Sequence, residues 1–194
     1  HLSIRRQRQM CIRDSYWMEH FGDPGFRFHA TMARLWGVVA LRLANADLLP
    51  FDVAAYADAI ATYVEELKSE TEPQFFAEHL APIQKEAQRL RHEASRTESR
   101  WQRWLAASPR HGAALARVNQ VLLQIERNLT HPDGLPGRPW FKHLLYAPQP
   151  NYQALTLPGI REALQQKDRK RAGEQAQRLR QAIEKLREQL KQAR

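Results

Sequence analysis

The sequence predicts an all-α protein, and two observations lead to that prediction. Apolar residues recur every three or four positions along most of the chain, which is the spacing of one buried helical face. No stretch alternates apolar and polar residues for long enough to indicate a strand, and residues 143–147 come nearest. Three apolar stripes follow residue 73, so we expect an up-down helical bundle after that point.

The N-terminal region changes character at about residue 15. Residues 1–14 show no apolar period, and we expect them to be unstructured or foreign to the natural gene. A turn is expected at residues 22–25, which contain two glycines and a proline. The first helix should then run from about 25 to 45, and its apolar stripe consists of Phe28, Met32, Leu35, Trp36, Val39 and Leu43.

The second helix is expected after Pro50, because a proline has no N–H to donate and ends the preceding helix. Asp52 is a suitable N-cap for this second helix. Its apolar stripe consists of Tyr56, Ile60, Tyr63, Val64 and Leu67.

The longest helix is expected from Pro73 to the Ser108–Pro109 pair. Its apolar residues form a seam like that of a coiled coil, so it should pack lengthwise on other helices. They are Leu80, Ile83, Ala87, Leu90, Ala94, Thr97, Trp101 and Trp104. Two later stripes consist of Leu115, Val118, Leu122, Ile125 and Leu129, and of Ala172, Ala176, Leu179, Ile183, Leu186 and Leu190. A short helix should open at Gly159 or Ile160 before the last stripe.

Residues 130–158 interrupt this helical pattern with several prolines and glycines. Loops of this length are usually functional or disordered. The segment contains Trp140, Phe141, Leu144 and Leu145, which is too much apolar surface to leave in water. It is therefore either a packed connector or a loop whose polar side chains face a site.

Composition narrows the possible partners. The formal net charge of +9 would suit a nucleic acid or an anionic membrane. However, arginine and lysine alternate with glutamate in residues 161–194, which usually marks a solvated helix face, so no nucleic-acid partner is expected. The single cysteine, Cys11, excludes a disulfide framework and a thiolate metal cage. No apolar run approaches the ~20 residues that cross a bilayer, so no membrane segment is expected.

His29 is the residue whose role the pattern leaves open. It lies in the first turn of the first expected helix, with no second histidine four residues later. A zinc site needs three or four ligands, and no motif here supplies them. The residues alone thus allow a structural histidine as well as a metal ligand.

Four segments in order resemble the C-terminal part of the glutamate carboxypeptidase / transferrin-receptor family. They are "FGDPGFRFHATMARLWG", "LANADLLPFD", "RNLTHPDGLPGRPWFKHLLYAP" and "LPGIREAL". The resemblance covers residues 15–194. It implies that residues 15–68 are the terminal helices of a truncated α/β zinc-peptidase domain and that residues 69–194 are a helical dimerisation domain.

The resemblance also implies a function and site residues. The intact protein would be a homodimeric co-catalytic zinc carboxypeptidase that holds two zinc ions and cleaves peptides. His29 would be its last zinc ligand, and Phe28, Asn151 and Tyr152 would lie near the substrate. The remaining ligands and the general base are not in this chain, so the fragment alone should hold no zinc and be inactive. Family members suggest an extracellular, periplasmic or membrane-anchored location.

Two other functions remain open. One is a non-enzymatic dimerisation module like that of the transferrin receptor, which belongs to the same family. The other is a basic helical protein that binds nucleic acid, which the net charge of +9 would permit.

Overall fold

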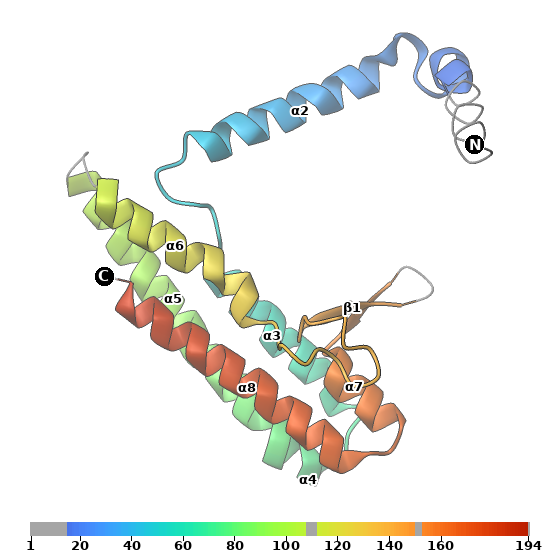
Figure 1. The fold of residues 1–194 in the computed structure, drawn as a ribbon, viewed down its shortest axis with the longest axis vertical. Helices are drawn as coiled ribbons and strands as arrows, with labels where there is room; N and C mark the ends of the chain where they lie inside the picture. The colour runs from blue at the N-terminus through green and yellow to red at the C-terminus, as the bar shows by residue number, and fades with distance from the viewer. Residues whose placement is uncertain (1–14, 108–111, 150–152, 194) are drawn as a thin grey trace. The chain divides into compact units, whose positions relative to one another are not determined.

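The computed structural model describes residues 15–107, 112–149 and 153–193, and these form two compact units. The first unit ends at Pro50, and the second extends from Phe51 to the C-terminus. Both are mainly helical (Figure 1), which confirms the predicted all-α class.

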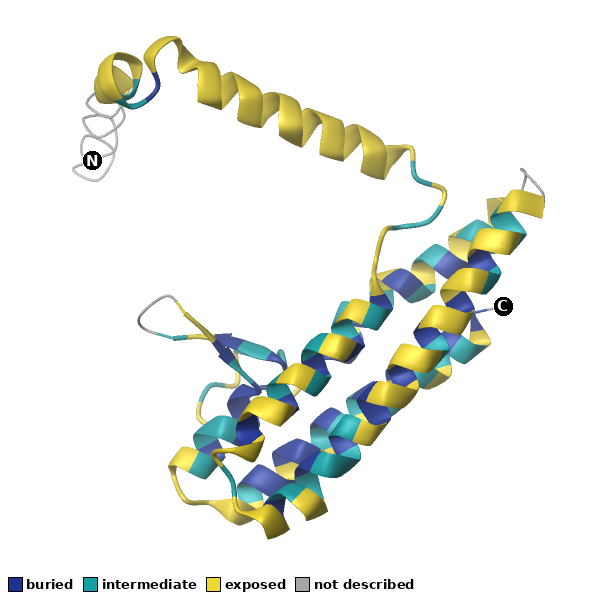
Figure 2. Ribbon diagram, turned by 180° about the vertical axis from the view of Figure 1, so that it is seen from behind, coloured by how far each residue is buried: buried dark blue, intermediate teal, exposed yellow. Residues whose placement is uncertain are grey.

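The first unit contains one long helix. A π-helical turn η1 (Met18–Gly22) and a 3-10 turn η2 (Pro24–Phe26) precede helix α2 (Arg27–Ala44). Gly25 has a φ of 73°, which a glycine adopts without steric cost, so the chain turns there before α2 begins. The helix expected from 25 to 45 is confirmed. No residue of α2 is buried, so its whole apolar stripe is exposed within this unit (Figure 2).

The second unit contains the bundle. Its helices are α3 (Val53–Lys68), α4 (Pro73–Phe75), the π-helical turn η3 (Phe76–Leu80), α5 (Ala81–Ala107), α6 (Gly112–Asn128), α7 (Pro158–Gln165) and α8 (Arg169–Gln192). The Asp52 side chain accepts a hydrogen bond from Ala55 N at 2.8 Å, which confirms the predicted N-cap of α3. Asp168 caps α8 in the same way through Arg171 N.

Helix α5 is the centre of the bundle, because it packs against both α3 and α8. Figure 1 shows that α6 runs antiparallel to α5 and that α8 runs antiparallel to α6, so α8 lies beside α5 and points the same way. This alternation is that of an up-down bundle. The predicted seam of α5 is buried from Leu80 to Trp101, whereas Trp104 is half-buried. At the far end of the bundle, the Trp101 indole N–H donates to the carbonyl oxygen of Ala193 at 3.2 Å.

The stretch between α6 and α7 is irregular, as predicted, except for a small hairpin. Strands β1 (Tyr146–Pro148) and β2 (Ala154–Thr156) pair antiparallel, with Ala147 opposite Leu155. A strand of three residues is too short to show alternation of apolar and polar side chains. The sequence therefore indicated only residues 143–147, which overlap the start of β1. Leu144 and Leu145 are buried, whereas Trp140 is exposed.

Helix α3 belongs to the second compact unit, because its buried residues Ala57, Ile60 and Val64 lie on a helix that packs against α5. The assignment of residues 15–68 to the end of a peptidase domain is not tested by these contacts and stays a prediction. Within the described residues, no helix is long and apolar enough to cross a membrane.

Candidate functional site

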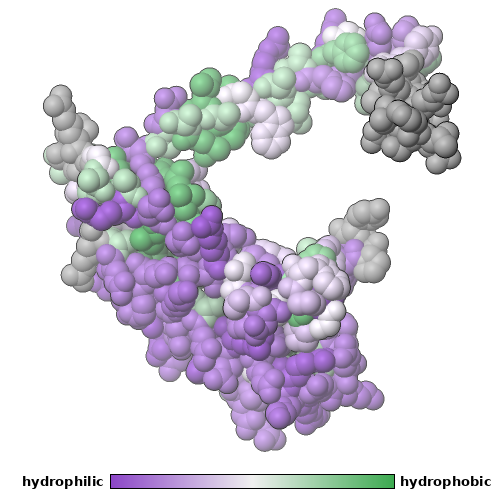
Figure 3. Space-filling view, in the orientation of Figure 1, coloured by the Kyte–Doolittle hydropathy of each residue, from purple (hydrophilic) through white to green (hydrophobic). Residues whose placement is uncertain are grey.

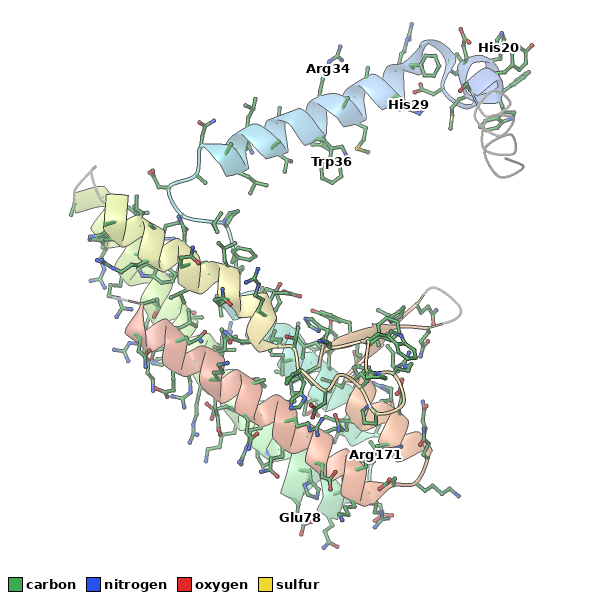
Figure 4. The ribbon with its side chains drawn as sticks, in the orientation of Figure 1. His20, His29, Arg34, Trp36, Glu78 and Arg171 are labelled. Carbon is green, nitrogen blue, oxygen red and sulfur yellow. The ribbon has the colours of Figure 1, made fainter. Side chains whose placement is uncertain are left out.

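The predicted site residues lie in two places. Phe28 and His29 occupy the first turn of α2 (Figure 4 labels His29), where the Phe28 residue is 74% exposed and the His29 side chain 53%. Asn151 and Tyr152 fall outside the described residues. Whether the four come together therefore stays a prediction.

Asp23 organises the start of α2. Its buried carboxylate accepts hydrogen bonds from the backbone N–H of Phe28 at 3.0 Å and of His29 at 2.8 Å. The first N–H groups of a helix have no partner inside the helix, so this carboxylate supplies one. Asp23 was not among the predicted site residues, although an acidic residue beside the Pro24–Gly25 turn was a possible signal.

The same carboxylate also holds the His29 ring, because Asp23 Oδ2 lies 2.6 Å from His29 Nδ1. Burial would raise the pKa of Asp23, but the hydrogen bonds from Phe28 and His29 outweigh burial and lower that pKa from 3.8 to about 2. Asp23 is therefore an anion near neutral pH, with both oxygens occupied by α2.

The Asp23–His29 contact is compatible with two roles. A metal-ligating histidine commonly donates its other ring N–H to a carboxylate, which would leave Nε2 for the metal. The same contact also explains His29 as a structural residue that fixes the helix start. Among the residues that the structure describes, no three His, Cys, Asp or Glu side chains are grouped closely enough to hold a metal ion. These residues do not fit a zinc site by themselves.

A polar cluster in the bundle joins α3, α6 and the irregular segment. The Tyr56 hydroxyl donates to Glu126 Oε2, and His143 Nε2 lies 2.9 Å from Glu126 Oε1. His143 Nδ1 accepts from Leu145 N at 3.1 Å, so the proton of the neutral ring is on Nε2 and points to Glu126. The hydrogen bond to Glu126, together with burial, raises the pKa of Tyr56 to about 12.

This cluster favours the packed-connector interpretation of residues 130–158. The His143 ring stacks on Tyr146 with centroids 4.9 Å apart, and its side chain is only 20% exposed. Arg138 forms an ion pair with Glu162 of α7, which anchors the segment at a second point. The described part of the segment thus packs on the bundle through named contacts.

Comparison with known proteins identifies this bundle. The sequence profile of the transferrin receptor-like dimerisation domain matches residues 78–191, which is more than half of the chain. The chain belongs to the transferrin receptor-like dimerisation domain family. The matched range contains the buried seams of α5, α6 and α8, so the family match and the packed core coincide. The predicted resemblance is confirmed at this level.

Several curated relatives of this chain carry the names of peptidases. A probable glutamate carboxypeptidase VP8 of Zea mays is 34% identical over 155 residues, which are 78% of this chain and 22% of the relative. The probable glutamate carboxypeptidase LAMP1 of Arabidopsis thaliana is 35% identical over 154 residues, 78% of this chain and 21% of the relative. The chain thus spans about a fifth of the length of the curated relatives that it matches.

The relatives of the dimerisation domain do not share one named activity. A protein of Schizosaccharomyces pombe that is 28% identical over 184 residues, 90% of this chain and 23% of the relative, is called an inactive zinc metalloprotease. The aminopeptidase NAALADL1 of Rattus norvegicus is 26% identical over 149 residues, 76% of this chain and 20% of the relative. The shared region alone therefore does not specify a reaction.

Proposed function

We propose that this chain is the C-terminal part of a homodimeric zinc carboxypeptidase and that its bundle provides the self-association surface. The observation that carries the proposal is the match of the dimerisation domain to residues 78–191, which contain the central helix and most of the buried core. The named carboxypeptidases among the relatives support the enzymatic part.

The outer face of α6 is the surface that best suits a second copy. Ala113, Ala116, Gln120 and Leu123 follow one another at intervals of three and four on this face, and all four are uncharged and exposed. Leu123 is 47% exposed, which leaves a large apolar side chain in water. Arg127, four residues after Leu123, is exposed and ends the uncharged part of this face. Identical surfaces meet across a two-fold axis, so the uncharged part avoids the repulsion that a strongly charged face would create.

The self-association test places a charge on this face. The double variant Ala116→Glu/Leu123→Glu should convert a dimer into a monomer, because two carboxylates would be buried without partners in each half of the interface. Sedimentation velocity at high micromolar concentration measures the mass, and far-UV circular dichroism checks that the helices persist.

A matched control adds a charge elsewhere. The double variant Gln177→Glu/Gln181→Glu on the exposed side of α8 should leave the dimer intact. A monomeric wild-type chain, or an Ala116→Glu/Leu123→Glu variant that still dimerises, would contradict the assignment of this face.

The apolar stripe of α2 supports the idea that the chain is part of a longer peptidase. Phe28, Leu35 and Trp36 are each more than half exposed on α2. Exposed apolar surface of this extent usually marks a contact with other protein. We propose that in the longer protein this stripe packs on the peptidase part, which brings Phe28 and His29 to its substrate and zinc ions.

The zinc proposal is tested in the full-length protein. If His29 is a ligand, as the family resemblance implies, His29→Ala should lower the bound zinc measured by elemental analysis and abolish release of the C-terminal residue from a peptide. If His29 only fixes the start of α2, the same variant should keep its full zinc content. The His92→Ala variant is the matched control, because it removes an exposed imidazole from α5 and leaves α2 unchanged.

The non-enzymatic alternative is favoured by one observation, the relative in Schizosaccharomyces pombe that is named inactive. The two functions differ in the sequence that precedes this region in the gene. An enzyme would have further His, Asp and Glu ligands there, together with a glutamate that acts as a general base. A dimerisation module would lack them.

A further inference from the structure

Helix α5 has a second seam, which faces solvent and is basic. It consists of Lys85, Arg89, His92, Arg96, Arg100 and Arg103, and we refer to these six residues as the basic track. They follow one another at intervals of four, three, four, four and three residues, so they share one helical face that is separate from the buried seam. From Lys85 to Arg103 the track extends about 27 Å along the helix axis.

The track is poorly neutralised by the surrounding carboxylates. Glu86 is buried and is shared between Arg187 of α8 and Arg89. Among the described residues, no carboxylate lies within 4.0 Å of the charged groups of Lys85, Arg96, Arg100 or Arg103. Glu93 lies beside the track and is the one carboxylate that lines its two hollows, so positive charge predominates on this face among the described residues.

Two of the arginines are held by the helix itself. Arg103 Nε donates to the carbonyl oxygen of Ser99 at 3.2 Å, and Arg100 Nη2 lies 3.4 Å from Thr97 Oγ1. Arg100 Nε is buried and has no hydrogen-bond partner among the described residues. Holding the guanidinium groups in this way lowers the entropy that each would lose on binding a ligand.

The track borders two adjacent hollows in the surface. One hollow is lined by Lys85, Arg89 and His92 of α5 together with Arg187 of α8. The next hollow is lined by Arg96, Arg100 and Arg103. The two hollows share His92 and Glu93. Figure 3 shows that the visible surface over α8, which borders this side of the bundle, is also predominantly hydrophilic.

A second copy of this chain is a poor partner for the track, because two basic tracks would repel each other. A membrane is also a poor partner, because no aromatic or aliphatic side chain belongs to the track that could insert among acyl chains. Single-stranded nucleic acid is bound largely by stacking of bases on aromatic side chains. Trp101 beside Arg100 is buried, and Trp104 beside Arg103 is half-buried, so neither offers a freely exposed ring for stacking.

We propose that the basic track binds a linear anionic polysaccharide that carries sulfate or phosphate esters. Arginine guanidinium groups form paired hydrogen bonds with such tetrahedral oxyanions. A straight row of cations suits a linear polymer with charges repeated along its length. This binding would be independent of zinc and of peptide cleavage.

The test uses heparin as the probe. Titration of the 194-residue chain with fluorescently labelled heparin should show binding that weakens on the order of a hundredfold between 50 and 200 mM salt, by analogy with other polyanions contacted by about four or five cations. The triple variant Lys85→Gln/Arg96→Gln/Arg103→Gln should bind at least about tenfold more weakly at 100 mM salt.

The matched control removes the same charge elsewhere. Lys142→Gln/Lys170→Gln/Lys185→Gln alters exposed cations of the irregular segment and of α8 and should bind heparin within about twofold of the wild type. Equal losses in the two triple variants would overturn the proposal, because binding would then depend only on net charge. Stronger binding to a DNA duplex or to phosphatidylglycerol vesicles than to heparin would also overturn it. Circular dichroism verifies that both variants remain folded.

Discussion

The carboxylate of Glu126 joins two parts of the chain that are far apart in sequence. One of its oxygens accepts from Tyr56 of α3, and the other faces His143 of the irregular segment. A hydrogen bond to a charged group contributes about 1.5–3 kcal/mol when it is well shielded from water, and less at a partly exposed site. This cluster is therefore one of the contacts that fix the irregular segment on the bundle.

Removal of the Tyr56 hydroxyl tests this contact. Tyr56→Phe should lower the free energy of unfolding by about 1 kcal/mol near pH 8, because Glu126 loses one donor.

The pKa of Tyr56 is raised from 10.0 to about 12 in the folded chain, chiefly by its hydrogen bond with Glu126. The stabilisation is thus complete below pH 10 and is lost as the pH rises toward 12. Urea unfolding at several pH values should show the variant and the wild type converging over this range. A constant difference would contradict this explanation.

Helices α5 and α8 are joined by an ion pair inside their apolar contact. Glu86 is 2% exposed and lies between Arg187 of α8 and Arg89 of its own helix. A buried carboxylate that loses one of its partners is left with an uncompensated charge, which is costly. This pair therefore makes the alignment of α8 on α5 depend on two residues that are about one hundred positions apart.

Substitution of one partner should cost more than substitution of both. Arg187→Leu should destabilise the bundle by about 3 kcal/mol, whereas Glu86→Leu/Arg187→Leu should cost distinctly less, because no buried charge remains. Urea denaturation of the two variants measures both values. The explanation fails if the double variant is the less stable of the two.

The apolar stripes allowed most of the helical elements to be predicted, because a period of three to four residues is a property of the local sequence. The Glu86–Arg187 pair and the Tyr56–Glu126–His143 cluster were not predicted, because each depends on contacts between distant segments. Asp23 was not among the predicted site residues either. Its role appeared once the fold placed its carboxylate against α2.

The chain as a whole combines a packed bundle with a helix, α2, that buries none of its residues against the described part of its own unit. The second unit contains the buried apolar core, whereas α2 contributes no buried residue. The stability of the bundle should therefore not depend on the first unit.

A chain limited to residues 51–194 tests this division. It should melt at the same temperature as the 194-residue chain within a few degrees, and it should bind much less of an apolar dye such as ANS, since the exposed stripe of α2 is removed. Circular dichroism and dye fluorescence measure the two quantities. A large loss of thermal stability would show that α2 supports the bundle.

The hydrogen bond between Trp101 and Ala193 has a practical consequence. Trp101 is 7% exposed, whereas Trp17, Trp36 and Trp140 are each more than half exposed. Tryptophan emission shifts to longer wavelength when the indole becomes exposed to water. The emission of Trp101 therefore reports whether the C-terminal end of α8 is packed against α5. A tag or a protease cut that disturbs the C-terminus would be visible in the emission spectrum before the bundle itself unfolds.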